Sequence, residues 1–393
     1  MRRGPGLDGG RRRVTLRDVA VAAGTTPMTV SNVVNGRSSQ VSEGLSKRVL
    51  DACRTLGYLP HANARRLRTD QRKTIGLVIV DPSPHYVSDP LTAAVLAGLS
   101  ADLGRNGYST VLHGVAPDAV DGIPLLKEIE SDGICLILSG ALAQRRRVIE
   151  RVTSLGQPVL LIQDKLPTTV EDGACVLQDD HAGGQAVAEH LFAEPCRHVA
   201  MLVPSTEWPA MKRREDGIRA VLRRLPHPPD FHVVRCGDEG FQATQDALAA
   251  HLDHFGPPDG LIGGNDQMAI AGMKLLRERG LRVPDDVRVT GFNGLEFWRY
   301  AEPELTTVFS PAYAVGEAAS EAMLARLRDG AFPFRERILP VLFSAHGSSR
   351  PSSARCEAQA NGSVSHDASR KATTIDLQSA RRRQKVPVTR GGP

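Results

Sequence analysis

The sequence predicts an α/β protein in which a small helix-turn-helix unit precedes a body of doubly wound parallel sheets. Between residues 14 and 60, short apolar segments begin at capping residues and end at glycines, which is typical of short packed helices. From residue 74 onward, buried apolar strands alternate with amphipathic helices, a series typical of parallel sheets. The chain has 393 residues, which is enough for two or three compact units.

The first two helices are predicted from their ends. Thr15 and Asp18 have the spacing of a capping box, and Gly24 breaks the pattern that they begin. Thr26 can cap the second helix, which runs to Asn35 and has a proline at its first position, where a missing N–H costs nothing. The apolar seam between the two helices is expected to contain Val19, Ala20, Ala23, Val30 and Val33.

A third helix is expected to begin after Ser42, as its cap, and to end at Gly57 in a left-handed conformation. Its predicted buried stripe contains Val49, Leu50 and either Cys53 or Leu56. After Pro60, the segment HANARRLR (61–68) has helical propensity but almost no apolar face. We therefore expect it to become ordered only when DNA packs against it.

The strands of the body are predicted from continuous apolar runs. IGLVIV (75–80) and STVLHG (109–114) flank a predicted helix over 91–107 that ends at Gly107. Further strands are expected at GICLILS (133–139), PVLLIQ (158–163), ACVLQ (174–178), HVAMLVP (198–204), HVVRC (232–236), GLIGG (260–264) and VRVTGFN (287–293). Ligands of such sheets bind where the carboxyl ends of the strands open onto a crevice.

Charge is distributed unevenly along the chain. The formal net charge is +10 over residues 1–73, +6 over residues 345–393 and −11 over the residues between them. The positive N-terminal part is therefore expected to bind polyanions such as DNA, and the negative middle part is expected to be repelled by them.

The six cysteines form no C-x-x-C pair and no cluster with histidine, so we expect reduced thiols and no disulfide or zinc site. No secretory signal or membrane-length apolar run is present, which predicts a cytoplasmic, nucleoid-associated protein.

A conjunction of motifs is more specific than any one of these patterns. VTLRDVAxxAG, TxxTVSxVVNG, VSxxxxxRV, LGYxP and ARRLR follow one another at set spacings, and the body contains DDHAGG, RREDG, NDQMAIAG, GFN and PELTTV. In this order, from Val14 to about Ser344, the chain resembles LacI/GalR-family transcription regulators. The resemblance implies a periplasmic-binding-protein-like core of two lobes with a cleft between them.

The resemblance also implies a division of the chain. The expected parts are a disordered basic arm (1–13), a helix-turn-helix DNA-binding domain (14–60), a hinge helix and linker (61–73), a two-lobed effector-binding and dimerisation core (74–344) and a disordered basic tail (345–393). The family usually ends before this polar, aperiodic tail. We interpret the tail as an inert extension rather than a second DNA contact.

The second helix is expected to enter the major groove of operator DNA. Family members choose bases at the positions of Pro27, Met28 and Asn32, and the arginine common at the last position is replaced here. Asn32 could pair with adenine or hold a phosphate contact. The remaining expected DNA contacts of the head are Thr15, Leu16, Thr26, Thr29, Ser31, Asn35 and Tyr58, and local capping is the alternative role of the polar ones.

Leu67 is an apolar residue on the otherwise polar hinge segment. The resemblance implies that it enters the minor groove as a wedge beside its symmetry mate, with Asn63, Ala64 and Arg68 next to it. Two hinge helices are needed to open the groove, so the protein is expected to be a homodimer that reads a nearly palindromic site; a tetramer is an open alternative.

By resemblance, the cleft binds a small-molecule effector such as a sugar or a related metabolite. The residues at the matching positions are Asp89, Gln163, Arg214, Asn265, Asp266 and Asn293. A guanidinium, amides and a carboxylate suit hydroxyls or an anionic group. However, Gln163 and Asn293 stand where sugar-binding members commonly carry aspartates. Phe297 and Trp298 are expected either to form an aromatic wall or to pack in the core.

The sequence and the resemblance together predict a transcription regulator that acts as a repressor, with activation as an open alternative, and with no enzymatic activity and no cofactor. The histidines are dispersed, and no nucleophile, general base or metal cluster is recognisable. A regulator without effector control is the main alternative. A free solute-binding protein would need an export signal and would not need the head.

Overall fold

A computed structural model describes residues 14–34, 41–58, 72–83, 86–123 and 130–350. The chain divides into two compact units, residues 1–72 and residues 73–393. The first contains the N-terminal head and the second contains the core. Among the described residues, no helix combines the length and apolar character that crossing a bilayer requires.

The head contains α1 (Leu16–Ala23), α2 (Pro27–Val34) and α3 (Glu43–Leu56). Thr15 caps α1 as predicted: its hydroxyl accepts the N–H of Asp18, whose carboxylate accepts the Thr15 N–H at 2.8 Å. Gly24 ends α1 at φ +62°. The Thr26 hydroxyl accepts the N–H of Thr29 at 3.2 Å, so the predicted start of α2 is also confirmed.

The core of the head is small. Its buried side chains are those of Val19, Ala20, Ala23, Val30, Val33, Val49, Ala52 and Tyr58. The predicted seam between α1 and α2 is confirmed, but the predicted stripe on α3 is partly wrong. Leu50 is 47% exposed and Leu56 is 36% exposed, because the helical period places Ala52, three residues after Val49, on the buried face. Ser42 precedes α3, as predicted, but its side chain makes no capping hydrogen bond.

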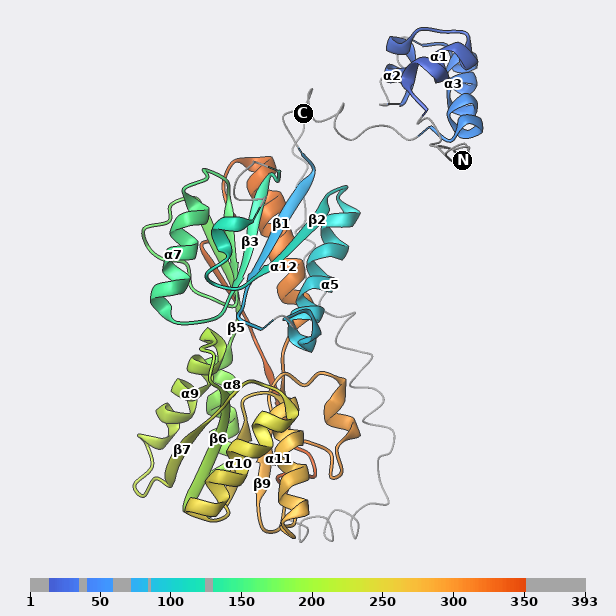
Figure 1. Ribbon diagram of the computed structural model, residues 1–393. Helices are drawn as coiled ribbons and strands as arrows, with labels where there is room; N and C mark the ends of the chain where they lie inside the picture. The colour runs from blue at the N-terminus through green and yellow to red at the C-terminus, as the bar shows by residue number, and fades with distance from the viewer. Residues whose placement is uncertain (1–13, 35–40, 59–71, 84–85, 124–129, 351–393) are drawn as a thin grey trace, which may run out of the picture. The chain divides into compact units, whose positions relative to one another are not determined.

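The first lobe of the core is built on a six-stranded parallel sheet with strand order β11-β5-β4-β3-β1-β2. These strands are β1 (Thr74–Val80), β2 (Ser109–Val115), β3 (Gly133–Leu138), β4 (Val159–Ile162), β5 (Gly173–Gln178) and β11 (Glu336–Leu339). Alternate side chains of β1 enter two hydrophobic clusters on opposite faces. One face is covered by α5 (Pro90–Arg105) and α12 (Ala312–Asp329), and the other by α7 (Leu142–Thr153) (Figure 1).

The second lobe contains a four-stranded parallel sheet with strand order β7-β6-β8-β9. Its strands are β6 (His198–Pro204), β7 (Asp230–Cys236), β8 (Gly260–Gly263) and β9 (Arg288–Thr290). One face packs against α8 (Asp180–Leu191) and α9 (Pro209–Leu222), and the other against α10 (Phe241–Phe255) and α11 (Asp266–Glu278) (Figure 1). Both lobes are therefore three-layered, as expected of doubly wound sheets.

Short elements complete the described core. The lobes are joined where β5 leads into α8, where β10 (Thr307–Phe309) leads into α12, and between β11 and β12 (Leu342–Ser344). Strands β10 and β12 form an antiparallel pair in the second lobe. The turns η2 (Tyr86–Ser88), η3 (Val120–Gly122) and η4 (Glu296–Tyr300) are 3₁₀ helices. The predicted fold class is confirmed, although the sequence did not predict β10, β11 and β12.

Candidate functional site

A cavity of about 320 Å³ lies between the lobes of the core. It is lined by residues that follow the carboxyl ends of strands in both sheets, where doubly wound folds place their ligands. From the first lobe these include Asp81 after β1 and Gln163 after β4; from the second they include Asn265 after β8 and Asn293 after β9. Chain segments more than 200 residues apart therefore build one binding surface.

Five of the six sequence-predicted cleft residues line this cavity: Asp89, Gln163, Arg214, Asn265 and Asn293. Asp266 does not line it. Its side chain is 3% exposed, accepts a hydrogen bond from the Thr307 hydroxyl at 2.5 Å, and borders a smaller recess beside the cavity. Burial raises the pKa of Asp266 to about 7. Asp266 therefore supports the wall of the cleft from behind, through its hydrogen bond with Thr307.

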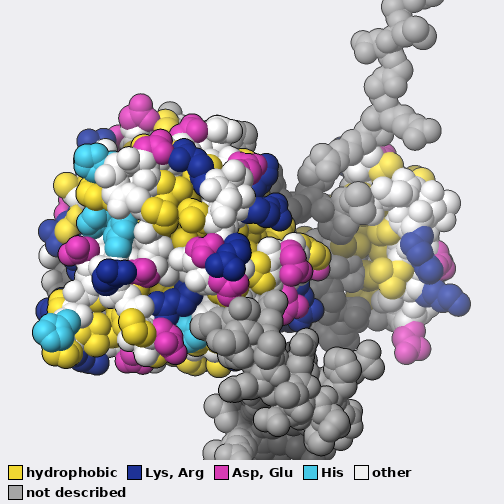
Figure 2. Space-filling view, turned by 90° about the horizontal axis from the view of Figure 1, so that it is seen from below, with side chains coloured by type: hydrophobic (Ala, Val, Ile, Leu, Met, Phe, Trp, Pro, Cys, Tyr) yellow, Lys and Arg dark blue, Asp and Glu magenta, His cyan; other side chains and the backbone are white. Residues whose placement is uncertain are grey.

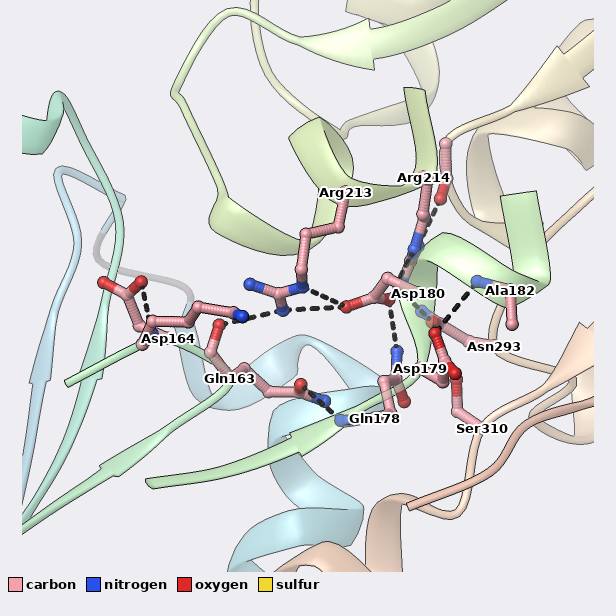
Figure 3. Close-up of polar contacts among 12 residues, drawn as sticks. Gln163, Asp164, Gln178, Asp179, Asp180, Ala182, Arg213, Arg214, Asn293 and Ser310 are labelled. Carbon is pink, nitrogen blue, oxygen red and sulfur yellow. Dashed lines mark hydrogen bonds and ion pairs between the residues drawn. The ribbon is translucent and has the colours of Figure 1, made fainter. Parts of the chain in front are cut away.

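Arg214 is held in a buried polar network (Figure 3). Its side chain is 2% exposed, and its Nε donates to Asp180 at 3.0 Å while Nη2 donates to the Asn293 side-chain oxygen at 3.0 Å. The fully buried carboxylate of Asp180 also accepts from Arg213 at 2.8 Å and from the Gln178 amide at 2.8 Å. Since Asp180 already neutralises Arg214, an anionic ligand would have to compete for a paired cation.

Two glycines explain how this network is positioned. A Cβ atom on Gly184 of α8 would lie 2.2 Å from the carbonyl oxygen of Arg214, and one on Gly217 of α9 would lie 2.1 Å from that of His181. Helices α8 and α9 can therefore approach closely only because both positions lack a side chain. That close approach brings Asp180, at the start of α8, within reach of Arg214.

Gln163 and Asn293 have unusual backbone conformations, with φ of +63° and +103°. Such conformations are costly for residues other than glycine and concentrate at functional sites. The Gln163 side-chain oxygen accepts the N–H of Gln178 at 3.1 Å, whereas its amide nitrogen is buried without a hydrogen-bond partner. Gln163 therefore brings an unsatisfied amide donor to the wall of the cavity.

Three further carboxylates line the cavity, and the sequence reading missed them: Asp81, Asp238 and Glu239. Burial, together with nearby Asp89, raises the pKa of Glu239 to about 7, and its carboxylate accepts the Asn265 amide at 2.7 Å. Burial also raises the pKa of Asp81, one of whose oxygens has no partner. Asp89 caps α5 and accepts the Thr92 N–H at 2.9 Å. Of these three carboxylates, Asp81 could have been predicted from the sequence, because it directly follows a predicted strand.

The aromatic residues of the cavity are not those suggested by the sequence. Trp298 packs in the core of the second lobe, with ring centroids 5.5 Å from Phe309 and 4.3 Å from His346. Phe297 is 42% exposed and borders the smaller recess. Tyr86 and Trp208 line the cavity instead. Trp208 immediately precedes the proline that begins α9. The sequence pattern did not indicate a role for this tryptophan.

In the head, the predicted base-reading residues Pro27 and Met28 are exposed, Met28 by 69%, and Asn32 is half-buried. Thr15 and Thr26 are exposed, but their hydroxyls make capping bonds, as the alternative interpretation expected. Leu16, Thr29 and Ser31 are half-buried, whereas the Tyr58 ring is 7% exposed and belongs to the core of the head. Asn35, Asn63, Ala64, Leu67 and Arg68 lie outside the described residues.

Comparisons with known proteins agree with this architecture. Residues 15–61 match the bacterial regulatory proteins of the lacI family, and residues 188–349 match the periplasmic binding protein-like domain. The chain is 28% identical over 320 residues to the HTH-type transcriptional repressor PurR of Vibrio atlanticus (strain LGP32), covering 80% of this chain and 92% of that protein.

Solved structures extend the comparison. A complex of the transcriptional regulator CelR with cellobiose has 25% sequence identity and a TM-score of 0.61, over 86% of this chain and 100% of that one. The Lac repressor dimer, bound to operator and the anti-inducer ONPF, has 24% identity and a TM-score of 0.75, over 86% of this chain and 99% of that one. The similarity to the Lac repressor dimer supports the assignment of the fold.

Proposed function

Because the chain belongs to the LacI family of bacterial regulatory proteins and is a DNA-binding transcription regulator, we propose that it represses transcription as a cytoplasmic homodimer bound to a nearly palindromic operator. We further propose that a small, donor-rich molecule in the cavity of the core controls this binding. The observation that carries the second proposal is the set of charged groups in the cavity wall: among the described residues, four carboxylates line it and its one guanidinium is already paired.

The proposed DNA contact is made by α2. Its exposed leading edge, Pro27 and Met28, is followed one turn later by Asn32, a spacing that presents the three side chains to a groove together. The remaining proposed contacts of the head would be made to DNA phosphates and would fix the position of α2 along the groove. They are Thr15, Leu16, Thr26, Thr29, Ser31, Asn35 and Tyr58. Residues 61–68, with Leu67 as the wedge and Asn63, Ala64 and Arg68 beside it, would open the minor groove in a dimer.

Selection from random duplexes followed by footprinting tests the DNA proposal. We expect two related half-sites in inverted orientation and an affinity that falls with salt by about 0.9 log units per log unit of salt for each phosphate neutralised. Inserting about half a helical turn between the half-sites should abolish tight binding, because a dimer presents its two α2 helices at one spacing. Equal binding to one isolated half-site would contradict the dimeric reading.

The proposed effector is a neutral or amine-bearing polyhydroxyl compound, sugar-like in size. Asp81, Asp89 and Glu239 offer acceptors for hydroxyl or ammonium donors, while the Gln163 amide offers a donor. Trp208 and Tyr86 supply apolar ring faces of the kind that stack on sugar rings. Cellobiose, the ligand in the CelR complex, has this chemistry. A phosphorylated ligand is disfavoured because Asp180 already pairs with Arg214.

Calorimetry on the full-length protein tests the effector class. The panel contains neutral mono- and disaccharides, an amino sugar, the corresponding sugar phosphates and free purines. Binding of a neutral or amino sugar, with a matching change in operator affinity, is the expected result, since a regulator needs differential affinity of the ligand for two states. Preferential binding of a sugar phosphate would overturn the assignment of donor-rich chemistry. Operator binding that no panel member changes would favour a regulator without effector control.

A further inference from the structure

Three histidines that are far apart in the sequence meet in the second lobe. His198 is the first residue of β6, His232 lies in β7 and His251 lies on α10. In the parallel register of β6 and β7, His232 pairs with Ala200, so His198 and His232 project from the same face of the sheet. Helix α10 covers that face, since Ala200 packs with Leu248 and Leu252, and it carries His251 onto the other two rings.

The ring nitrogens of this histidine cluster have a spacing suited to metal coordination. The Nε2 atoms of His198 and His251 are 3.2 Å apart, and one nitrogen from each of the three rings lies within 4.8 Å of the others. Two imidazole nitrogens on one tetrahedral zinc ion, each about 2.0–2.1 Å from the metal, are about 3.4 Å apart. The first pair already has this separation.

We propose that His198, His232 and His251 form a binding site for one divalent transition-metal ion, Zn²⁺ by preference, with a water molecule at the fourth position. Three imidazoles and an open position are a ligand set that zinc accepts. The three residues are brought together only by strand register and helix packing, so the metal site that the sequence did not predict has no local sequence signal.

Simple packing leaves part of this arrangement unexplained. A hydrogen bond between two neutral imidazoles accounts for the His198–His251 contact, but the Nδ1 atom of His232 is buried and has no hydrogen-bond partner. Burying a polar atom without a partner is costly, and a metal ion is one way to satisfy it.

The histidine cluster packs against an aromatic ring and lies apart from the effector cavity. The Phe255 ring, one helical turn after His251, packs 4.4 Å from His232 and 5.0 Å from His251 between ring centroids. Histidine side chains also gather along one side of the lobe surface seen from below in Figure 2. The site lies at the amino end of β6, whereas Pro204 at the carboxyl end lines the effector cavity. A bound ion would therefore link β6, β7 and α10 without competing for the effector.

Metal analysis of the untagged full-length protein tests this site. The unmodified protein and the variants His232→Gln and His251→Gln are each treated with a chelator and dialysed against buffered Zn²⁺. We expect the unmodified protein to bind one more zinc ion per chain than either variant. Each of these variants should weaken zinc binding by more than the roughly 10- to 100-fold that loss of an outer-shell partner costs. Co²⁺ in place of Zn²⁺ should give the visible absorption bands of a tetrahedral nitrogen-ligated ion.

The matched control is His254→Gln, which changes a histidine on the same helix that packs against Phe255 but lies outside the cluster. It should retain zinc as the unmodified protein does. His232 is only half-buried, so its variant keeps the test valid if His251→Gln fails to fold. The proposal would be overturned if His232→Gln bound as much zinc as the unmodified protein. It would also be overturned if His254→Gln lost as much zinc as His232→Gln.

Discussion

The two candidate binding surfaces of this chain are built in opposite ways. On the head, the proposed base-reading residues lie within the first two turns of α2, and Met28 is 69% exposed. In the core, the cavity is assembled from loops and helices of both lobes, and Arg214, which lines it, is 2% exposed. Changes at the exposed base-reading positions Pro27 and Met28 should therefore affect DNA binding more than the fold. Residues of the cavity such as Arg214 also take part in buried networks of the fold, so changes there should alter stability as well as binding.

The sharpest test of this difference is Arg214→Leu. Removing one partner of a buried ion pair typically costs about 3–5 kcal/mol, and Asp180 would keep only the more exposed Arg213 as its cationic partner. Urea unfolding of the full-length protein should show this loss, since Asp180 is fully buried. Arg213→Leu is the matched control: Arg213 contacts the same carboxylate but is 19% exposed, and it should cost about 1 kcal/mol. Equal small losses for both variants would contradict the structural role of Arg214.

A second effect comes from Glu239 and depends on pH. Its pKa rises from the ordinary 4.5 to about 7 in the folded protein, so between these values the folded state binds more protons than the unfolded state. The stabilisation is complete below the lower value and is lost as the pH rises through about 7. Glu239→Gln, which cannot ionise, should match the unmodified protein in urea unfolding at about pH 4 and exceed its free energy of unfolding by about 1–3 kcal/mol at about pH 8. A pH-independent difference would contradict this account.

On the head, Asn32→Ala should leave the fold unchanged and alter the choice of base at one position of each half-site by about 1–3 kcal/mol. Selection from randomised operators measures this. The comparison variant is Thr29→Ala, a proposed phosphate contact, which should weaken binding to all sequences alike. An unchanged sequence preference in Asn32→Ala would reduce Asn32 to a structural residue.

The smallest expected effect concerns helix capping in the head. Thr15→Ala removes a capping box, which typically costs about 0.5–2 kcal/mol, and hydrogen exchange of the amides of α1 should report it as easier local opening. Ser42→Ala changes the same kind of position at α3, where the side chain makes no capping bond, and should have almost no effect. Equal effects of the two changes would show that the bonds at Thr15 add nothing to stability.

The comparison also explains how far the sequence could predict the molecule. The caps of α1 and α2 and the long strands depend on local patterns, and these predictions are confirmed. Short strands such as β10 and β12 carry too few residues for a recognisable period. Which side chains face a cavity depends on loop geometry, so Glu239 and Trp208 were missed. The histidine cluster depends on strand register, which a single sequence does not reveal.

Trp208 has a consequence of its own. The sequence contains two tryptophans, and Trp298 is packed against Phe309 and His346 away from the cavity. Trp208 lines the cavity, so a molecule that enters should change the polarity around its indole ring. With Trp298→Phe, the emission of a single fluorophore would follow the filling of the cavity. The protein thus contains an optical reporter with which unlabelled candidate effectors can be titrated directly.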